Sequence, residues 1–149
     1  MKSSKRFMFT VVAVAITLLT SCKKESMKEQ IIGTWDMVAR QSKTIESTPI
    51  NSKDIDWDWI YNLEQNTQNR PWIFTEETVN YYESKTPCPY SIDDEGKITI
   101  LEDCWDWGNI GEIYYVKIKD EYLLWATINP NENDERCYFY GARFKRVSE

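Results

Sequence analysis

Histidine is absent from this chain, and its absence limits the chemistry that the 149 residues can carry out. Without a histidine base, Ser-His-Asp and Cys-His catalytic sets cannot be built in their usual form, and zinc sites with histidine ligands are excluded. Aspartate and glutamate are abundant, but no spacing singles out a carboxylate pair for glycoside hydrolysis. We therefore expect a protein that is not an enzyme, with no catalytic residue, no metal and no cofactor.

The most distinctive pattern is Trp-Asp-Trp, which occurs at residues 57–59 and again at residues 105–107. An indole face beside a carboxylate suits a sugar ring, because the apolar C–H surface stacks on the indole while hydroxyl groups donate to the acid. Ordinary packing at the ends of a fold is the alternative interpretation and the more common use of such residues. The candidate ligand contacts are Trp57, Trp59, Trp105, Trp107, Tyr114 and Tyr140.

The segment Asp54–Leu63 is expected to form a short amphipathic helix, with Asp54 as its N-cap. Apolar side chains recur at four-residue spacing from Ile55 onward, and acids occupy the first turn. The alternating aspartates also resemble the start of a calcium loop. An EF-hand, however, requires glycine where Trp59 stands and an acid where Gln65 stands. We interpret the helix as a structural plug over an apolar surface, with a functional lid as the alternative.

The first residues have the anatomy of a secretory signal peptide. Lys2, Lys5 and Arg6 precede an apolar run at residues 7–19, which is short for a membrane span. The run leads into Leu19-Thr20-Ser21-Cys22, which resembles a bacterial lipobox, whose cysteine receives a thioether lipid before cleavage. An ordinary signal peptide with a chance cysteine is the alternative.

Cleavage before Cys22 would leave a lipid-anchored protein. We expect residues 1–21 to be removed, residues 22–30 to form a lipidated tether and residues 31–149 to fold as one domain. Several acyl chains, palmitate among them, would hold Cys22 stably on a membrane. Lys23 does not resemble the aspartate that retains some lipoproteins in the inner membrane. We therefore expect a cell-envelope lipoprotein of the outer membrane, on either its periplasmic side or its surface.

The charge and the aromatic content describe the remaining domain. Removal of residues 1–21, which hold three basic residues and no acid, would change the formal net charge from −6 to −9. No basic run remains, which argues against nucleic acid as a partner. Seven Trp, nine Tyr and five Phe are typical of a folded β domain with an aromatic core. We expect this domain to be a monomer.

Three cysteines remain for the domain. Cys88 and Cys104 lie at nearly equal distances from the Glu95-Gly96 turn and so fall opposite each other across a hairpin. In an oxidising compartment they would close a loop of ~17 residues, worth ~3 kcal/mol in the chain-entropy model. A pairing that involves Cys137, and no bridge at all, are the alternatives.

Eight strands are expected, joined mostly by tight turns, and Asp94-Glu95-Gly96 is the strongest hairpin signal. An antiparallel meander hides its edges most simply by closing, so the expected fold class is an all-β, up-and-down eight-stranded barrel. The expected strands cover residues 31–40, 71–75, 78–83, 88–93, 97–102, 111–119, 122–128 and 136–147. The side chains expected to point inward are Met37, Phe74, Tyr81, Ile98, Ile100, Tyr114, Val116, Leu124 and Tyr140.

The two ends of the domain carry a family resemblance. Gly33-Thr34-Trp35 on the first strand, the tight hairpins and the final Phe144-Lys145-Arg146-Val147 resemble the lipocalin-like (calycin) lipoproteins of Gram-negative bacteria, from Ile31 to Val147. In that family the Trp of Gly-x-Trp closes one end of the barrel, and a basic side chain from the last strand packs across its indole. The resemblance implies this role for Gly33, Trp35 and Arg146, with Arg143 as the second choice for the cation.

The resemblance and the expected fold together suggest a function. An eight-stranded barrel has room for its own side chains or for one small ligand. The expected function is that of a membrane-anchored lipocalin-like binding protein, which holds a small hydrophobic or amphipathic ligand in the barrel. The alternative is a surface interaction module with a side-chain-filled barrel, whose exposed aromatics bind a glycan or a protein.

Overall fold

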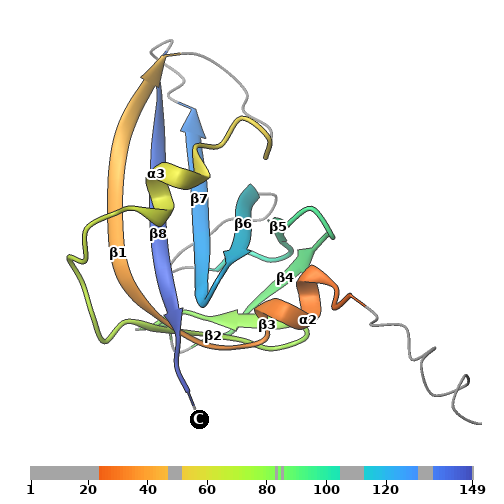
Figure 1. Ribbon diagram of the computed structural model, residues 1–149. Coiled ribbons are helices and arrows are strands. Elements are labelled where there is room, and N and C mark those ends of the chain that lie inside the picture. Colours follow the sequence, from red (N-terminus) through yellow and green to blue (C-terminus); the bar gives the residue numbers. More distant parts are fainter. Residues whose placement is uncertain are drawn as a thin grey trace, which may run out of the picture.

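The computed structural model of the chain describes residues 24–46, 52–82, 84, 86–104, 113–130 and 136–148. In this part of the chain, eight antiparallel strands follow one another round a closed barrel, and the first strand also pairs with the last (Figure 1). The predicted all-β eight-stranded barrel is confirmed. The elements are α2 (Met27–Ile31), β1 (Gly33–Glu46), α3 (Trp57–Tyr61), β2 (Pro71–Phe74), β3 (Thr78–Asn80), β4 (Cys88–Ile92), β5 (Lys97–Ile100), β6 (Ile113–Lys119), β7 (Tyr122–Pro130) and β8 (Arg136–Arg146).

β1 begins and ends later than the sequence predicts. The prediction that Ile31 belongs to the first strand is wrong, because Ile31 is the last residue of α2. The Ser26 side chain accepts a hydrogen bond from the Glu29 backbone N–H at 3.2 Å, and the Glu29 carboxylate accepts one from the Ser26 N–H at 2.8 Å. This reciprocal capping box satisfies N–H groups that a helix start otherwise leaves free. It explains why a helix forms within the segment that was expected to be only a tether.

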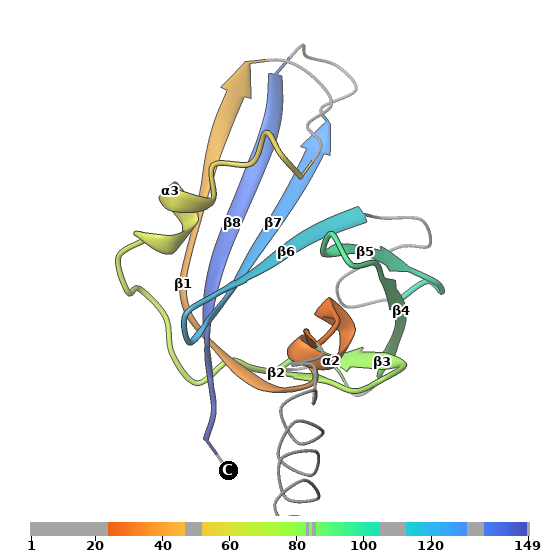
Figure 2. The ribbon, with the colours of Figure 1, turned by 45° about the vertical axis from the view of Figure 1, so that its right-hand side comes forward.

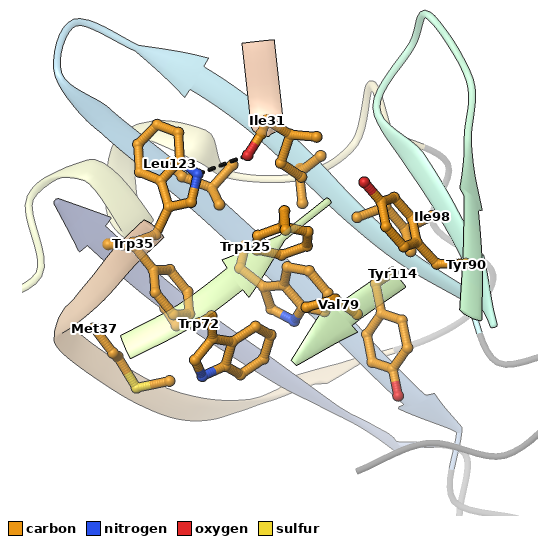
Figure 3. Packing of buried hydrophobic residues seen from close by; sticks show 14 of the residues in the cluster. Ile31, Trp35, Met37, Trp72, Val79, Tyr90, Ile98, Tyr114, Leu123 and Trp125 are labelled. Carbon is orange, nitrogen blue, oxygen red and sulfur yellow. Dashed lines mark hydrogen bonds between the residues drawn. The ribbon is translucent and has the colours of Figure 1, made fainter. Parts of the chain in front are cut away.

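The inner faces of the strands meet across the barrel axis (Figure 3). The Trp72 ring of β2 lies 5.0 Å from that of Trp125 on β7 and 4.9 Å from that of Phe144 on β8. Tyr114 of β6 lies 4.9 Å from Trp125. These are spacings of packed aromatic pairs, so described side chains fill the middle of the barrel. The other buried members of this core are Ile31, Trp35, Met37, Phe74, Val79, Cys88, Tyr90, Ile98, Ile100, Val116, Leu123 and Ala142.

Most of the side chains predicted to point inward belong to this core. Those buried in it are Met37, Phe74, Ile98, Ile100, Tyr114 and Val116, whereas Tyr81 and Tyr140 are partly buried against it. The prediction for Leu124 is wrong, because Leu124 lies on the outer face, while Leu123 and Trp125 point inward. β7 is buried on both faces from Leu123 to Ala126. An apolar run of this kind does not reveal which side chains face the barrel.

A register shift between Met37 and Ala39 divides β1 into two parts. Met37 pairs with Phe144 and Ala39 with Arg143, so Val38 is an extra residue, a β-bulge. An extra residue reverses the alternation of side chains: Met37 belongs to the barrel core, whereas Ala39 belongs to a cluster on the outer face. Beyond the bulge, β1, β8 and β7 continue past the ring of shorter strands as a three-stranded extension (Figure 1).

The end of the barrel away from this extension is closed by α2 (Figure 2). Ile31 is fully buried in the core, and its carbonyl oxygen accepts a hydrogen bond from Trp35 Nε1 at 2.7 Å (Figure 3). The Arg146 guanidinium carbon lies 4.6 Å from the Trp35 ring centroid, and Arg146 Nη2 donates to the Gln30 carbonyl at 2.5 Å. Gly33 has a φ of +135°, which favours glycine over L side chains. These contacts fasten the entry of the chain to the last strand.

The predicted disulfide between Cys88 and Cys104 is confirmed. Cys88 begins β4 and is fully buried, and Cys104 follows β5, with a Cα–Cα distance of 5.8 Å. The bond therefore joins the β4–β5 hairpin at the end away from its turn. At the turn itself, Asp93 Oδ1 accepts hydrogen bonds from the backbone N–H groups of Glu95 and Lys97.

Trp35→Ala should lower the free energy of unfolding by about 3–5 kcal/mol, as large aromatic truncations in cores do. Trp35 is 2% exposed and would lose both the hydrogen bond to Ile31 and the contact with Arg146. Urea denaturation followed by circular dichroism measures the change. Tyr82→Ala, at a 43% exposed aromatic, is the control and should cost less than about 1 kcal/mol. A loss below about 1 kcal/mol for Trp35→Ala would contradict its closing role.

Reduction of the disulfide should lower the unfolding free energy by about 3 kcal/mol, because it releases a closed loop in the unfolded chain. The two cysteines are 16 positions apart in the sequence. Guanidinium unfolding with and without reductant measures the difference. The double variant Cys88→Ala/Cys104→Ala should show no further response to reductant. Equal stability of the oxidised and reduced protein would contradict this stabilising role.

Candidate functional site

The outer face of the three-stranded extension carries a second apolar core beneath α3 (Figure 1). Its buried members are Ala39, Leu124, Ala126 and Phe139 of the sheet and Ile55, Ile60 and Leu63 in and around α3. The helix is shorter than predicted, and its N-cap is Asp56, whose side chain accepts from the Trp59 N–H at 3.0 Å. The prediction of Asp54 as the cap is wrong. The predicted plug thus lies outside the barrel, against the sheet.

Gly141 of β8 allows α3 to approach the sheet closely. A Cβ at this position would lie 2.7 Å from Trp59 Cζ3 and 2.9 Å from Ile60 Cγ1. Arg143, two residues further along β8, donates a hydrogen bond to the Tyr61 carbonyl at the end of α3. Arg143, the second choice for the cation that closes the barrel, therefore holds this helix instead.

The two tryptophans of α3 are held by the protein's own groups. Trp57 Nε1 donates to the Ser52 carbonyl at 3.1 Å. The Trp59 ring lies 5.4 Å from that of Phe139, and Lys43 Nζ lies 4.1 Å from the Trp59 ring centroid. A cation already covers this indole, which leaves less of its surface for a sugar ring. For this Trp-Asp-Trp motif, the contacts favour the packing interpretation.

The acids at the start of α3, Asp56 and Asp58, also bond to groups of the protein itself. Asp56 caps the helix and lies 3.5 Å from Lys43 Nζ, and Asp58 lies 3.0 Å from Lys119 Nζ. The hydrogen bond to Asp58 raises the pKa of Lys119 above its ordinary value. In the part of the chain that the structure describes, no three or more acidic or cysteine side chains are placed to hold a metal ion. Capping and ion pairing therefore account for Asp56 and Asp58 in the stretch that resembles a calcium loop.

A groove of about 660 Å³ lies beside α3 on the outside of the molecule. It is lined by Gln41, Asp56, Asp58, Trp59, Asn62, Leu63, Glu64, Gln65 and Asn66. Eight of these nine side chains can form hydrogen bonds, three of the eight are carboxylates, and none of the nine is lysine or arginine. The volume is in the range of binding pockets in general. The surface beside α3 is thus polar and hollowed, and Glu64 is its carboxylate without an ion pair among the described residues.

The lining of this groove includes Asn66, which lies against the edge of β1 that faces away from β8. β2 pairs with β1 only as far as the Asp36–Pro71 position. Beyond it, the Val38 carbonyl accepts from the Asn66 N–H at 3.1 Å. The Asn66 side chain accepts from the Arg40 N–H at 3.0 Å and donates to the Arg40 carbonyl at 2.7 Å. Asn66 thus satisfies Arg40 as the backbone of a neighbouring strand would.

The barrel end opposite α2 is lined by tyrosines. Tyr81 and Tyr140 are partly buried against the core. The Tyr81 ring lies 5.3 Å from that of Trp72, and Tyr140 Oη donates to Met37 Sδ at 3.9 Å. Burial raises the pKa of Tyr140 above its ordinary value, and the nearby charge of Arg40 opposes this shift. This mouth is therefore a half-buried aromatic surface.

The candidate ligand contacts do not converge on one site within the described residues. Trp57 and Trp59 lie on the outside, Tyr114 is buried in the barrel and Tyr140 lies at its mouth. Trp105 and Trp107 fall outside the described residues, as does Cys22. Cys137 is part of β8, but its side chain is not among those described.

Asn66 is the main feature of the site that the sequence did not identify. It lies in the connection between β1 and β2, after α3, where apolar residues have no period. Asparagine side chains can pair with backbone groups, but Asn62 and Asn69 share that property. Only the folded chain shows which asparagine meets the β1 edge.

The chain matches no family model, no curated protein and no solved structure. Among the helices in the described ranges, none has the length and apolar character needed to cross a membrane. The structural features that bear on function are the barrel core, the groove beside α3 and the edge of β1.

Gly141→Ala should loosen α3 while the barrel stays folded, because the new methyl group would meet Trp59 and Ile60. We expect a loss of about 1–3 kcal/mol, as overpacked sites show. Hydrogen exchange at the Ile60 and Asn62 amides, which bond within this helix, should accelerate. Ser91→Ala, at an exposed position on β4, is the control. Adding Trp59→Ala to Gly141→Ala should relieve the clash with Trp59 and leave that with Ile60. Unchanged exchange in Gly141→Ala would contradict the close approach.

Proposed function

We propose that this chain is a lipid-anchored, lipocalin-like interaction module of the Gram-negative cell envelope, and that it binds a polypeptide. Its filled barrel is the scaffold, and the groove beside α3 is the binding surface. The observation that carries this proposal is the contrast between the packed barrel axis and the open groove outside it. The protein acts by binding and not by catalysis.

The packing of the barrel supports a surface site. Trp72 spans the interior, with ring contacts to Trp125 and Phe144 at 5.0 and 4.9 Å. Phe74 lies 5.8 Å from Tyr90 and 6.4 Å from Trp125 in the same core. A ligand in the middle of the barrel would have to displace these rings. Core residues resist such rearrangement because protein interiors are close-packed.

The groove supports a polypeptide over a sugar. Lys43 lies over the Trp59 ring, so this tryptophan is not a free stacking platform, and Trp57 is not part of the groove lining. The groove instead offers amide and carboxylate side chains near the side of β1 that has no partner strand beyond Asp36 among the described residues. Backbone edges recognise other backbones, and the alternating side chains add specificity.

The proposed anchor rests on Leu19-Thr20-Ser21-Cys22, which resembles a lipobox. We assign the lipid, with palmitate among its acyl chains, to Cys22, and the protein to the outer membrane. The lipocalin-like assignment is supported by the eight-stranded barrel and by the contact of Arg146 with Trp35. In this arrangement the membrane and one polypeptide are the partners, and nucleic acid is not.

A second candidate function is the transport of a small hydrophobic or amphipathic ligand. The observation that favours it is the half-buried pair Tyr81 and Tyr140 at the barrel mouth, beside Arg40. An apolar chain could lie against the two rings, and its polar head could meet the guanidinium. The packed core below, at Trp72 and Trp125, would confine such a ligand to the mouth.

A photoreactive residue at Gln65 should form a discrete crosslinked adduct in cells of the source bacterium. Gln65 lines the groove and is exposed, so a bound polypeptide would lie within reach. The matched control is Glu95, exposed on the β4–β5 turn at a position that does not line the groove. The adduct should be present for Gln65 and absent for Glu95. No adduct, or the same adduct from both positions, would contradict a groove partner.

A dye competition separates the two candidate functions. If the protein is a surface module, a fluorescent hydrophobic dye should not bind the purified protein saturably at one-to-one stoichiometry. Fatty acids should therefore displace no specifically bound dye. Saturable displacement that is lost in Tyr140→Ala, and retained in Trp59→Ala, would support the small-ligand carrier and overturn the surface module.

A further inference from the structure

The edge of β1 beyond Arg40 has an unusual exposure for a barrel strand. β1 pairs with β8 from Trp35 opposite Arg146 to Glu46 opposite Arg136, interrupted by the bulge at Val38. On its other side, β2 ends its pairing at Asp36, and Asn66 then pairs with Arg40. Closed barrels normally leave no edge of this kind. The remainder of β1 therefore has one partner strand and one open side within the described chain.

Two residues direct their backbone groups to this open side. In an antiparallel pair, successive residues alternate between bonding to the neighbouring strand and facing away from it. Arg40 faces away from β8, since both its N–H and its C=O bond to Asn66. Ser42 and Thr44 lie two and four residues after Arg40, so their backbone N–H and C=O groups point to the same side. Both residues are exposed. Among the residues that the structure describes, none bonds to their backbone groups on this side.

The usual protection of an edge strand is weak here. Lysine, proline and bulges commonly keep edges from pairing with other chains. Lys43 is the lysine of this segment, but it is held on the outer face, 3.5 Å from Asp56 and 4.1 Å from the Trp59 ring centroid. The bulge at Val38 precedes the open stretch. On the other side of the extension, β7 ends in Pro130, which has no N–H to donate.

The charge beside the edge indicates the kind of partner. The outer face next to Gln41 is the groove, where lysine partners balance the charges of Asp56 and Asp58. Glu64 is exposed and has no ion pair among the described residues. A second copy of this chain, with a formal net charge of −6, would bring like charge to the groove. A basic segment of another protein meets this surface with the complementary charge.

We propose that the β1 edge at Ser42 and Thr44 binds an extended, basic segment of another protein by strand addition. Lysine or arginine side chains at alternate positions of that segment lie over the groove that Glu64 lines. This inference rests on the proposed function and specifies the binding mode of the same site. Asn66 ends the open stretch at Arg40, so the added strand is short and its affinity modest.

The test uses the purified full-length protein and a synthetic probe. The probe is a fluorescent peptide of about eight residues, the length of an ordinary strand, in which lysine alternates with threonine. The matched peptide carries glutamate in place of lysine. We expect the lysine peptide to bind at least tenfold more tightly at low salt and its affinity to fall as salt is added.

Ser42→Pro tests whether the probe binds the β1 edge, with Ser42→Ala as its control, and Glu64→Gln tests whether the probe lies over the groove. Ser42→Pro removes an N–H that faces away from β8, so it should leave the ladder to β8 intact and weaken binding at least tenfold. Ser42→Ala keeps that N–H and should bind like the parent protein. Glu64→Gln should weaken binding of the lysine peptide severalfold and should not weaken binding of the glutamate peptide, because it removes an attraction for the first and a repulsion of the second. Equal affinity of Ser42→Pro and Ser42→Ala would overturn strand addition.

Hydrogen exchange on the unmodified protein gives a readout that does not depend on the folding of Ser42→Pro. The lysine peptide should slow exchange at the amides of Ser42 and Thr44, which lack a partner in the described chain. The amides of Gln41 and Lys43, already bonded to β8, should change little. No slowing at Ser42 and Thr44 would overturn the inference. A specific adduct from Gln65 together with that result would leave the groove partner standing and refute only strand addition.

Discussion

The extra residue at Val38 is the constraint on which the rest of this structure depends. Before it, the odd-numbered side chains Trp35 and Met37 of β1 pack in the barrel; after it, the odd-numbered Ala39 and Ile45 lie on the outer face. One long strand can therefore serve two apolar cores. The same reversal places Ala39 beneath α3 and leaves the Arg40 backbone facing away from β8, where Asn66 pairs with it. Without the bulge, one strand could not both close the barrel and seat the helix.

The large features of the fold follow from local signals in the sequence. Turn residues and the spacing of strands predicted a closed meander, and equal distances from the Glu95-Gly96 turn predicted the Cys88–Cys104 bond. The face of Leu124 was not predictable, because β7 is buried on both sides and its apolar run has no alternation. The sequence pattern did not predict the β-bulge at Val38 either. A bulge changes the pairing of two strands that are far apart in sequence, and no single residue type announces it.

The candidate site was harder to predict than the fold, for a related reason. Trp57 and Trp59 were recognisable as unusual, but their contacts with Ser52 and Lys43 depend on how α3 meets the sheet. Gly141 decides that approach from a position more than seventy residues away in the sequence. Trp59 and the two acids beside it line the groove. The unpaired backbone of β1, on which the proposed binding mode rests, carries no side-chain signal.

The position of α2 has a mechanical consequence. The helix closes the barrel end away from the extension, and its N-cap is Ser26, four residues after Cys22 (Figure 2). Four extended residues span at most about 14 Å. A lipid on Cys22 would therefore keep the closed end of the barrel close to the bilayer, within the reach of these four residues. The extension of β1, β7 and β8 would then lie at the end of the barrel that is distant from the membrane. The open edge of β1 would face away from the bilayer.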